Sequence, residues 1–260
     1  MKRELYKTMV ELTQNPLYTN VLKRFATSRI SGKLTKSFAN VYKINHEEHV
    51  GNIADYRSLH EYFIRELKEG VRPIDQNERS VVSPVDGVLS QFGVIEEQAT
   101  FHVKGKDYSL STMLGLEKTS ERYIGGTYML FYLSPRDYHR IHSPLSGEVV
   151  KRYALGKYSE PVNQMGLLLG DYPLAKNYRL ITEVEKNGKR VAVVKIGALN
   201  VNSVQPSHLD TTVNKGEELA YFTFGSTVVL LFEKGMIVPT MDDSDKDIQI
   251  QHGQPVGIFV

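Results

Sequence analysis

Three side chains in this sequence are of the types that together can turn a hydroxyl group into a nucleophile. Ser226 follows Gly225 directly before an apolar run, Asp86 stands in a Pro-Val-Asp-Gly segment, and His142 lies three residues after His139. In sets of this kind a histidine takes the proton of the serine, and an aspartate orients the histidine. The sequence therefore predicts a nucleophilic serine at position 226, with His142 as its base and Asp86 as the orienting group.

The residues around Ser226 also indicate what the hydroxyl group attacks. An ordinary serine hydrolase has glycine two residues after the nucleophile, whereas residue 228 is valine. The nearest carbonyl is that of Gly225, and glycine can enter strained backbone conformations that expose its carbonyl group. We therefore expect Ser226 to attack its own chain at Gly225.

Each of these residues also has an ordinary structural interpretation. Aspartate before glycine is common in turns, and two histidines three residues apart could be half of a zinc site. The sequence offers no third zinc ligand, so we expect no metal. Single histidines are mostly structural or surface residues, and no role is assigned to the other six: His46, His49, His60, His102, His208 and His252.

At these motifs the chain resembles the phosphatidylserine decarboxylase family, whose proenzymes cleave themselves at a Gly-Ser bond in a Leu-Gly-Ser-Thr type signature. Phe224 stands where the commonest form of the signature has leucine, a change that leaves the reacting atoms untouched. Residues 63–74 and 215–219 also resemble the family, and all the motifs occur in the family's order. The resemblance thus runs nearly from end to end of the chain.

The resemblance implies a pyruvoyl enzyme of phospholipid biosynthesis, which converts phosphatidylserine to phosphatidylethanolamine after self-cleavage between Gly225 and Ser226. The pyruvoyl group would derive from Ser226 and would serve as an electron sink, as pyridoxal phosphate does in other decarboxylases. His139 would return a proton to the substrate. Residues 134–137 have the composition of a turn, and a helical turn there would bring both histidine rings to one site.

The expected partners follow from the same resemblance. The two cleavage fragments, residues 1–225 and 226–260, would stay together as a heterodimer, which could associate further into a homo-oligomer. Phosphatidylserine and a membrane surface are the expected binding partners, and no nucleic acid is expected. Two alternatives remain open: a pyruvoyl decarboxylase of a soluble amino acid, and a non-catalytic module that binds lipid surfaces.

Basic residues are concentrated near the N-terminus. Residues 1–43 contain nine lysines and arginines against two glutamates, a balance of +7 in a chain whose net charge is +2. Apolar residues recur between these charges at helical spacing. Basic amphipathic helices are suited to anionic lipid, although the same pattern would fit a helical cap packed on the core. The family resemblance favours membrane contact.

The location expected for the protein is the cytoplasmic side of the cell membrane, bound peripherally. No apolar run approaches the roughly 18 to 20 residues of a membrane span, and the first 20 residues lack the apolar region of a signal peptide. The absence of cysteine agrees with a reducing compartment.

The predicted fold is α+β, with N-terminal amphipathic helices followed by a mainly antiparallel, sandwich-like β core. We expect a helical segment over residues 1–75 and a β-rich catalytic domain over residues 76–260. Ser58 and Glu61 predict a capping box for a helix that runs through Lys68. Seven apolar runs predict strands: 88–95, 128–133, 148–154, 180–184, 191–196, 219–224 and 227–232.

Two further signals concern the strand connections. The pair Asn187-Gly188 predicts a hairpin with a type I′ turn. The segment that begins at Ser83 recurs 60 residues later at Ser143, and Lys215-Gly216 is echoed by His252-Gly253. Turn-then-strand echoes of this kind resemble the two-fold hairpin sandwiches of biotinyl and lipoyl carriers, in shape only.

Overall fold

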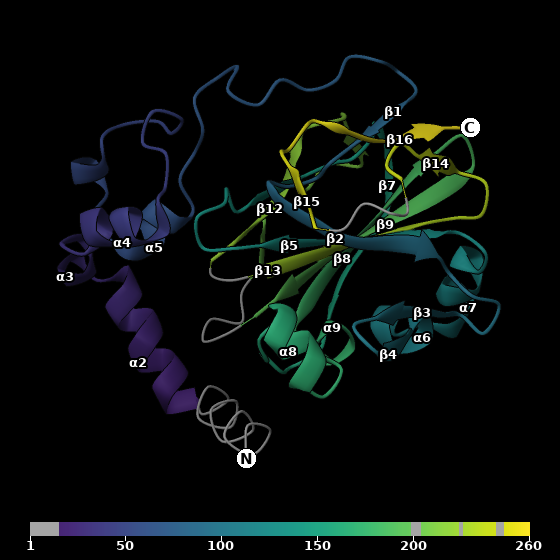
Figure 1. Ribbon diagram of the computed structural model, residues 1–260, viewed down its shortest axis with the longest axis horizontal. Coiled ribbons are helices and arrows are strands. Elements are labelled where there is room, and N and C mark those ends of the chain that lie inside the picture. The colour runs from purple at the N-terminus through teal and green to yellow at the C-terminus, as the bar shows by residue number, and fades with distance from the viewer. Residues whose placement is uncertain (1–15, 199–203, 224–225, 243–246) are drawn as a thin grey trace.

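The computed structural model describes residues 16–198, 204–223, 226–242 and 247–260, and within them a group of short helices stands beside a larger β body (Figure 1). None of the helices within these ranges is both long and apolar enough to cross a membrane. The N-terminal group comprises α2 (Pro16–Thr27), α3 (Arg29–Gly32), α4 (Thr35–Tyr42), η1 (Ile53–Asp55) and α5 (Leu59–Phe63). The β body carries α6 (Leu110–Leu114), α7 (Glu117–Ser120), η2 (Glu121–Tyr123), α8 (Gln164–Leu169) and α9 (Pro173–Lys176).

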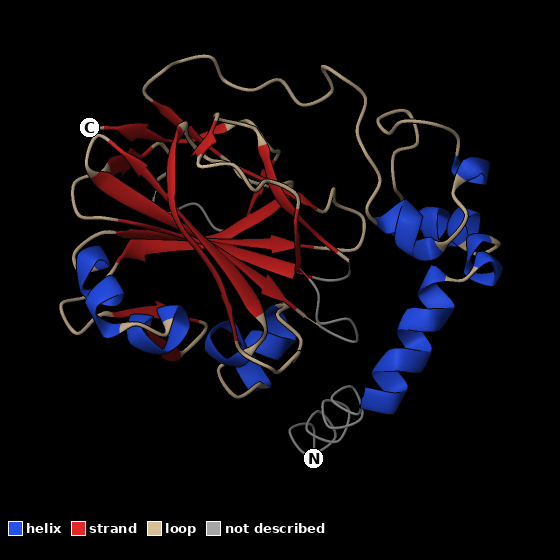
Figure 2. Cartoon of the chain, turned by 180° about the vertical axis from the view of Figure 1, so that it is seen from behind, coloured by secondary structure: helices blue, strands red, loops and turns tan. Residues whose placement is uncertain are grey.

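The strands form one large sheet and three small ones, all antiparallel within the described residues (Figure 2). The eight-stranded sheet has the order β11 (Thr212–Val213), β7 (Gly147–Leu155), β8 (Arg179–Lys186), β9 (Lys189–Gly197), β13 (Ser226–Phe232), β5 (Thr127–Leu133), β2 (Gly87–Val94) and β15 (Ile248–Ile250). One three-stranded sheet has the order β1 (Ser80–Val82), β16 (Pro255–Phe259) and β14 (Ile237–Pro239). The other has the order β10 (Val204–Pro206), β12 (Glu218–Phe222) and β6 (Arg140–His142). The strands β3 (Thr100–Val103) and β4 (Lys106–Ser109) form a hairpin.

This architecture confirms the predicted fold class. Each of the seven apolar runs overlaps one of the strands, although Phe224 at the end of the run 219–224 lies outside the described residues. Strand β13 is buried over its whole length between β5 and β9. Asn187 and Gly188 have φ angles of 53° and 77°, so the predicted type I′ hairpin between β8 and β9 is confirmed. The division into domains at residue 75 stays a prediction.

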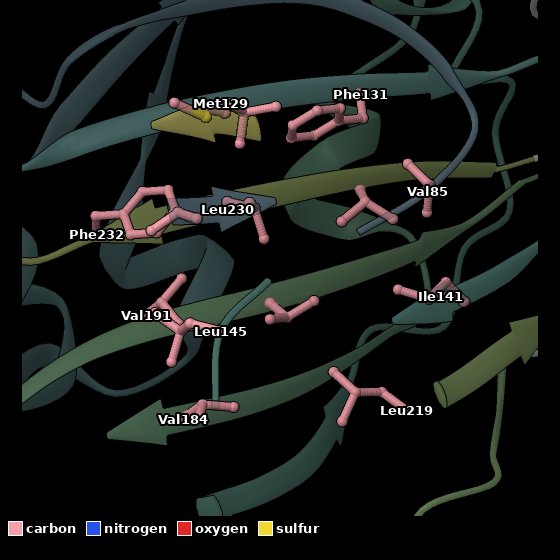
Figure 3. Close-up of a cluster of buried hydrophobic side chains, with 14 of the residues drawn as sticks. Val85, Met129, Phe131, Ile141, Leu145, Val184, Val191, Leu219, Leu230 and Phe232 are labelled. Carbon is pink, nitrogen blue, oxygen red and sulfur yellow. The ribbon is translucent and has the colours of Figure 1, made fainter. Parts of the chain in front are cut away.

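Strand β13 contributes to hydrophobic clusters on both faces of the large sheet, because side chains alternate along a strand. Val228, Leu230 and Phe232 belong to one cluster, whereas Val229 and Leu231 belong to the other. Figure 3 shows the first cluster, in which Leu230 and Phe232 lie with Ile141 of β6 and Leu219 of β12. Ser226 precedes Val228 by two residues, so its side chain lies on the face of this first cluster.

The internal echo corresponds to a repeat in the fold. The two halves of the large sheet have the same connectivity. Counted from each edge, the second, third and fourth strands follow one another in chain order, and the edge strand comes last. By this count β7 corresponds to β2, β8 to β5, and β9 to β13. The turns match bond for bond: Gly216 N donates to Ser143 O at 2.9 Å, and Gly253 N donates to Ser83 O at 3.1 Å. The predicted two-fold relation between these segments is therefore confirmed.

The helix that begins after Ser58 is shorter than predicted. The Ser58 hydroxyl accepts the N–H of Glu61, so the N-cap is confirmed, but α5 ends at Phe63 rather than Lys68. The reason is tertiary: Val50 N donates to Glu66 O and Lys68 N donates to Glu48 O. These residues pair with an extended segment and cannot continue the helix.

Candidate active site

Ser226 is the first residue of β13, where it pairs with Leu133 of β5 and Gly197 of β9. The residue is 1% exposed, and its Oγ has no hydrogen-bond partner among the described residues. A buried hydroxyl group without a partner is rare, because it loses its bonds to water without replacing them. Gly225, the residue that precedes Ser226, lies outside the described residues.

His142 is a buried, neutral histidine on β6. Its Nδ1 donates to the carbonyl oxygen of Gly216 at 2.9 Å, and since a carbonyl can only accept, the lone pair lies on Nε2. The Nε2 atom is 3.3 Å from the hydroxyl group of Tyr138. Burial, and then the neighbouring His252, hold the pKa of His142 well below its usual value. At neutral pH His142 can therefore accept a proton at Nε2.

Asp86 is bound by an arginine and not by a histidine side chain. Arg72 Nε lies 3.1 and 3.0 Å from the two carboxylate oxygens, and Arg72 Nη2 donates to Oδ2 at 2.8 Å. The other contact of the carboxylate is the backbone N–H of His252, at 2.9 Å from Oδ1. The ring of His252 stacks on that of His142, with the centroids 3.7 Å apart. Among the described residues, His252 therefore links Asp86 to His142.

No hydrogen bond joins Ser226, His142 and Asp86 in the described structure, so the expected direct relay is not formed. The alternation of side chains along β6 explains why His142 does not contact Ser226. Ile141 contributes to the cluster that contains Val228, the cluster that Ser226 also faces, so His142 points to the other side of β6. The roles of the three residues stay predictions.

His139 lies before β6 and is fully buried against the ring of Phe63. Its Nδ1 donates to Asp137 O at 2.8 Å, and its Nε2 has no partner among the described residues. Burial, together with the nearby charge of Arg65, lowers the pKa of His139 to about 3. His139 is therefore also neutral, with a free lone pair in a buried site.

The predicted turn after Ser134 is confirmed, but the prediction that a helical turn brings the two histidine rings together is wrong. Asp137 N donates to Ser134 O at 2.9 Å, and the chain then enters β6, which pairs with β12. His139 O accepts the N–H of Phe222, which lies four residues before Ser226. His142 instead pairs with Glu218, eight residues before Ser226. The partner of His139 on β12 is thus closer to Ser226 along the chain than the partner of His142.

Three residues of this site were missed by sequence reasoning: Arg65, Arg72 and His252. The repeat carried a signal for His252, since it precedes Gly253 as Lys215 precedes Gly216. Lys215 N donates to the hydroxyl of Ser146 at 2.8 Å, just as His252 N donates to Asp86. The hydrogen bond from the backbone of His252 to Asp86 is therefore a feature of the repeated fold. The negative charge of Asp86 is not, because the corresponding residue in the other copy is Ser146.

The β body thus contains a buried serine hydroxyl without a hydrogen-bond partner among the described residues, two neutral histidines and an ion-paired aspartate. Residues 59–258 match the family model for phosphatidylserine decarboxylase. The chain is 54% identical over 237 residues to the phosphatidylserine decarboxylase proenzyme of Bacillus thuringiensis (strain Al Hakam), covering 91% of this chain and 90% of the relative. The corresponding proenzyme of Bacillus cereus (strain ATCC 10987 / NRS 248) is 55% identical over the same coverage. The chain belongs to the phosphatidylserine decarboxylase family, and the resemblance seen in the sequence is confirmed.

Proposed function

We propose that this protein decarboxylates phosphatidylserine to phosphatidylethanolamine, using a pyruvoyl group that its own chain forms from Ser226. The observation that carries the proposal is the buried hydroxyl of Ser226 at the start of the central strand, which has no hydrogen-bond partner in the part of the chain that the structure describes. Membership of a family whose relatives are named proenzymes supports it.

Self-processing would begin with attack of Ser226 Oγ on the carbonyl carbon of Gly225. The C–O bond forms, the C–N bond breaks, and the serine proton passes through a base to the freed amine, which converts the amide to an ester. Loss of the Ser226 α-proton then breaks the Cβ–Oγ bond, and hydrolysis of the resulting dehydroalanine releases ammonia and leaves the ketone. We propose His142 as the base, because it is neutral and carries its lone pair on Nε2; His139 shares these properties, and the two single variants distinguish them.

The surroundings of Ser226 fit a pyruvoyl group. The backbone of β13 is paired with β5 and β9 from Ser226 to Phe232, which would hold the new N-terminus in place after cleavage. The 35-residue fragment would remain joined to the rest through β13, β15 and β16 as a heterodimer. When formed, the group supplies an electron sink for the carbanion that remains after loss of CO2. Decarboxylation consumes one proton per turnover, and His139, which is neutral at rest, would take this proton from solvent at Nε2 and pass it to the substrate carbon.

The test is an intact mass measurement followed by a CO2-release assay. Wild-type protein is expected to give a 225-residue and a 35-residue fragment under denaturing conditions, and both together in a native measurement. Ser226→Ala should remain one chain of 260 residues that releases no CO2, while the exposed control Ser111→Ala is cut and active. An uncut wild-type protein that still releases CO2 from phosphatidylserine would refute the pyruvoyl route. Turnover of free serine instead of the lipid would favour the soluble amino acid alternative.

We further propose that the N-terminal helices hold the protein on the cytoplasmic face of the cell membrane. The described part of these helices exposes large apolar side chains among basic ones, including Val21 (67% exposed), Ile30 (69%) and Val41 (72%). A helical cap on the core would be expected to cover such side chains. Of the basic segment, residues 1–15 lie outside the described residues.

Charge removal on these helices should weaken binding to anionic vesicles. The triple variant Lys23→Gln, Arg24→Gln, Lys33→Gln is expected to lose about a hundredfold in affinity at low salt, since each cation contributes about 1 kcal/mol near such a surface. The loss should shrink in high salt, where charges are screened. The control replaces the exposed Lys118, Lys157 and Lys234 of the β body. If the two triple variants sediment equally with anionic vesicles, the N-terminal helices do not bind the membrane and serve as a cap on the core.

A further inference from the structure

A polar pocket lies where the N-terminal segment meets the β body. Its volume is about 380 Å³, and it is lined by residues of both parts, among them Lys43, Arg65, Asp86, Arg136 and Tyr138. Asp86 and Tyr138 also belong to the cluster around His142. The pocket therefore opens beside the candidate active site.

Arg65 is a buried cation in this pocket. The residue is 5% exposed, its Nη2 donates to Arg136 O at 2.8 Å and to Asp137 O at 3.0 Å, and its Nη1 has no hydrogen-bond partner among the described residues. Within the described ranges, no carboxylate oxygen lies within 4 Å of its nitrogens. A buried charge without a counterion is costly, so Arg65 is poised to bind an anion.

The carboxylates of the same pocket are already engaged. Glu48 and Asp86 both accept from Arg72, and the Oδ2 of Asp137 accepts from the N–H and the hydroxyl of Ser134. Arg136 is partly neutralised by Asp137, at 3.6 Å. Among the described lining residues, the buried cation without a carboxylate partner is therefore Arg65. The exposed Lys43 also lines the pocket and adds a second positive charge.

The pocket is within reach of Ser226. Gly87 lines it, and the backbone of Gly87 is so close to β5 that an added Cβ would lie 2.3 Å from Tyr132 O. Leu133, the next residue of β5, pairs with Ser226. Two strand spacings therefore separate the pocket from Ser226, about 10 Å in all.

We propose that Arg65 binds the phosphodiester of the substrate head group in this pocket; the inference rests on the proposed function. In a glycerophosphoserine head group the phosphorus is three bonds from the carbon that loses CO2, so a phosphate bound at Arg65 keeps the amine and the reacting carbon beside this pocket. Phosphate is favoured over the substrate carboxylate, because an arginine that stabilised the departing carboxylate would stabilise the ground state and slow the reaction. Guanidinium groups are well matched to phosphate oxygens.

Binding is tested without turnover, on full-length Ser226→Ala protein, with glycerophosphoserine, serine and inorganic phosphate as separate titrants. Glycerophosphoserine is expected to bind at least tenfold more tightly than either serine or inorganic phosphate, and Arg65→Gln should remove this preference. Arg65→Lys should restore part of it, whereas Arg122→Gln, which breaks a distant ion pair with Glu233, should leave it unchanged. Inorganic phosphate that binds as tightly as glycerophosphoserine would overturn the head-group assignment.

A kinetic arm separates substrate binding from a structural role. In the processed enzyme Arg65→Gln should raise the KM for phosphatidylserine about tenfold or more and change kcat much less. If Arg65→Gln does not fold, the exposed Lys43→Gln provides the second variant, with a smaller rise in KM. An unchanged KM in every variant that folds would refute the proposal. If wild-type protein binds glycerophosphoserine tightly but releases no CO2 from phosphatidylserine, the proposed function is refuted, whereas the proposal that Arg65 binds the phosphate is not.

Discussion

His142→Ala is expected to leave nearly all of the protein as an uncut chain, whereas His139→Ala is expected to be cut between Gly225 and Ser226 but to release CO2 about 10² to 10⁴ times more slowly. The reason is that processing needs a base for the Ser226 hydroxyl, while turnover needs a proton for the substrate carbon. Both histidines are neutral and have Nδ1 bound to a carbonyl, so each can accept a proton at Nε2: His142 that of Ser226, and His139 one from solvent for the substrate carbon. Gel mobility and CO2 release on the same preparations measure the two reactions separately.

His46→Ala is the matched control for these variants, because His46 is exposed and should affect neither reaction. The opposite result, an uncut His139→Ala beside a fully processed His142→Ala, would transfer the processing role to His139. The register of the structure gives that outcome a physical basis, since His139 pairs with Phe222 and His142 with Glu218, farther from Ser226.

The charge of Asp86 can be separated from its role in the fold. Asp86→Ser keeps an acceptor for the N–H of His252, as Ser146 does for Lys215 in the other copy of the repeat. It also leaves Arg72, whose side chain is 9% exposed, with Glu48 as its remaining carboxylate. Since removing one partner of a buried ion pair is costly, we expect a loss of about 3 kcal/mol in the free energy of unfolding and an uncut chain.

The double variant Arg72→Gln, Asp86→Ser decides between the two roles of the carboxylate. Removing both charges should recover most of the lost stability, measured by denaturant unfolding, because the buried charge of Arg72 that had lost one of its two carboxylates is then absent. If Asp86 acts in processing, the stable double variant remains uncut on a denaturing gel. A double variant that is cut like wild type would reduce Asp86 to a structural partner of Arg72.

The sequence by itself determined the features that depend on neighbours in the chain. Apolar runs such as residues 227–232 became buried strands, and Asn187-Gly188 formed its turn because both residues tolerate positive φ. The echo between Ser83 and Ser143 predicted the repeat, since equal turn residues make equal backbone bonds. The types of residue at the candidate site, and the family, could likewise be read from local motifs.

Only the tertiary structure decided which side chains meet. Arg72, rather than a histidine, binds Asp86, and strand alternation turns His142 away from the side that Ser226 faces. Residues 66–68 pair with residues 48–50, so α5 stops at Phe63 although its helical pattern continues. A buried charge or backbone group takes the partner that packing brings within about 3 Å, and the spacing of residues along the chain carries no record of that distance.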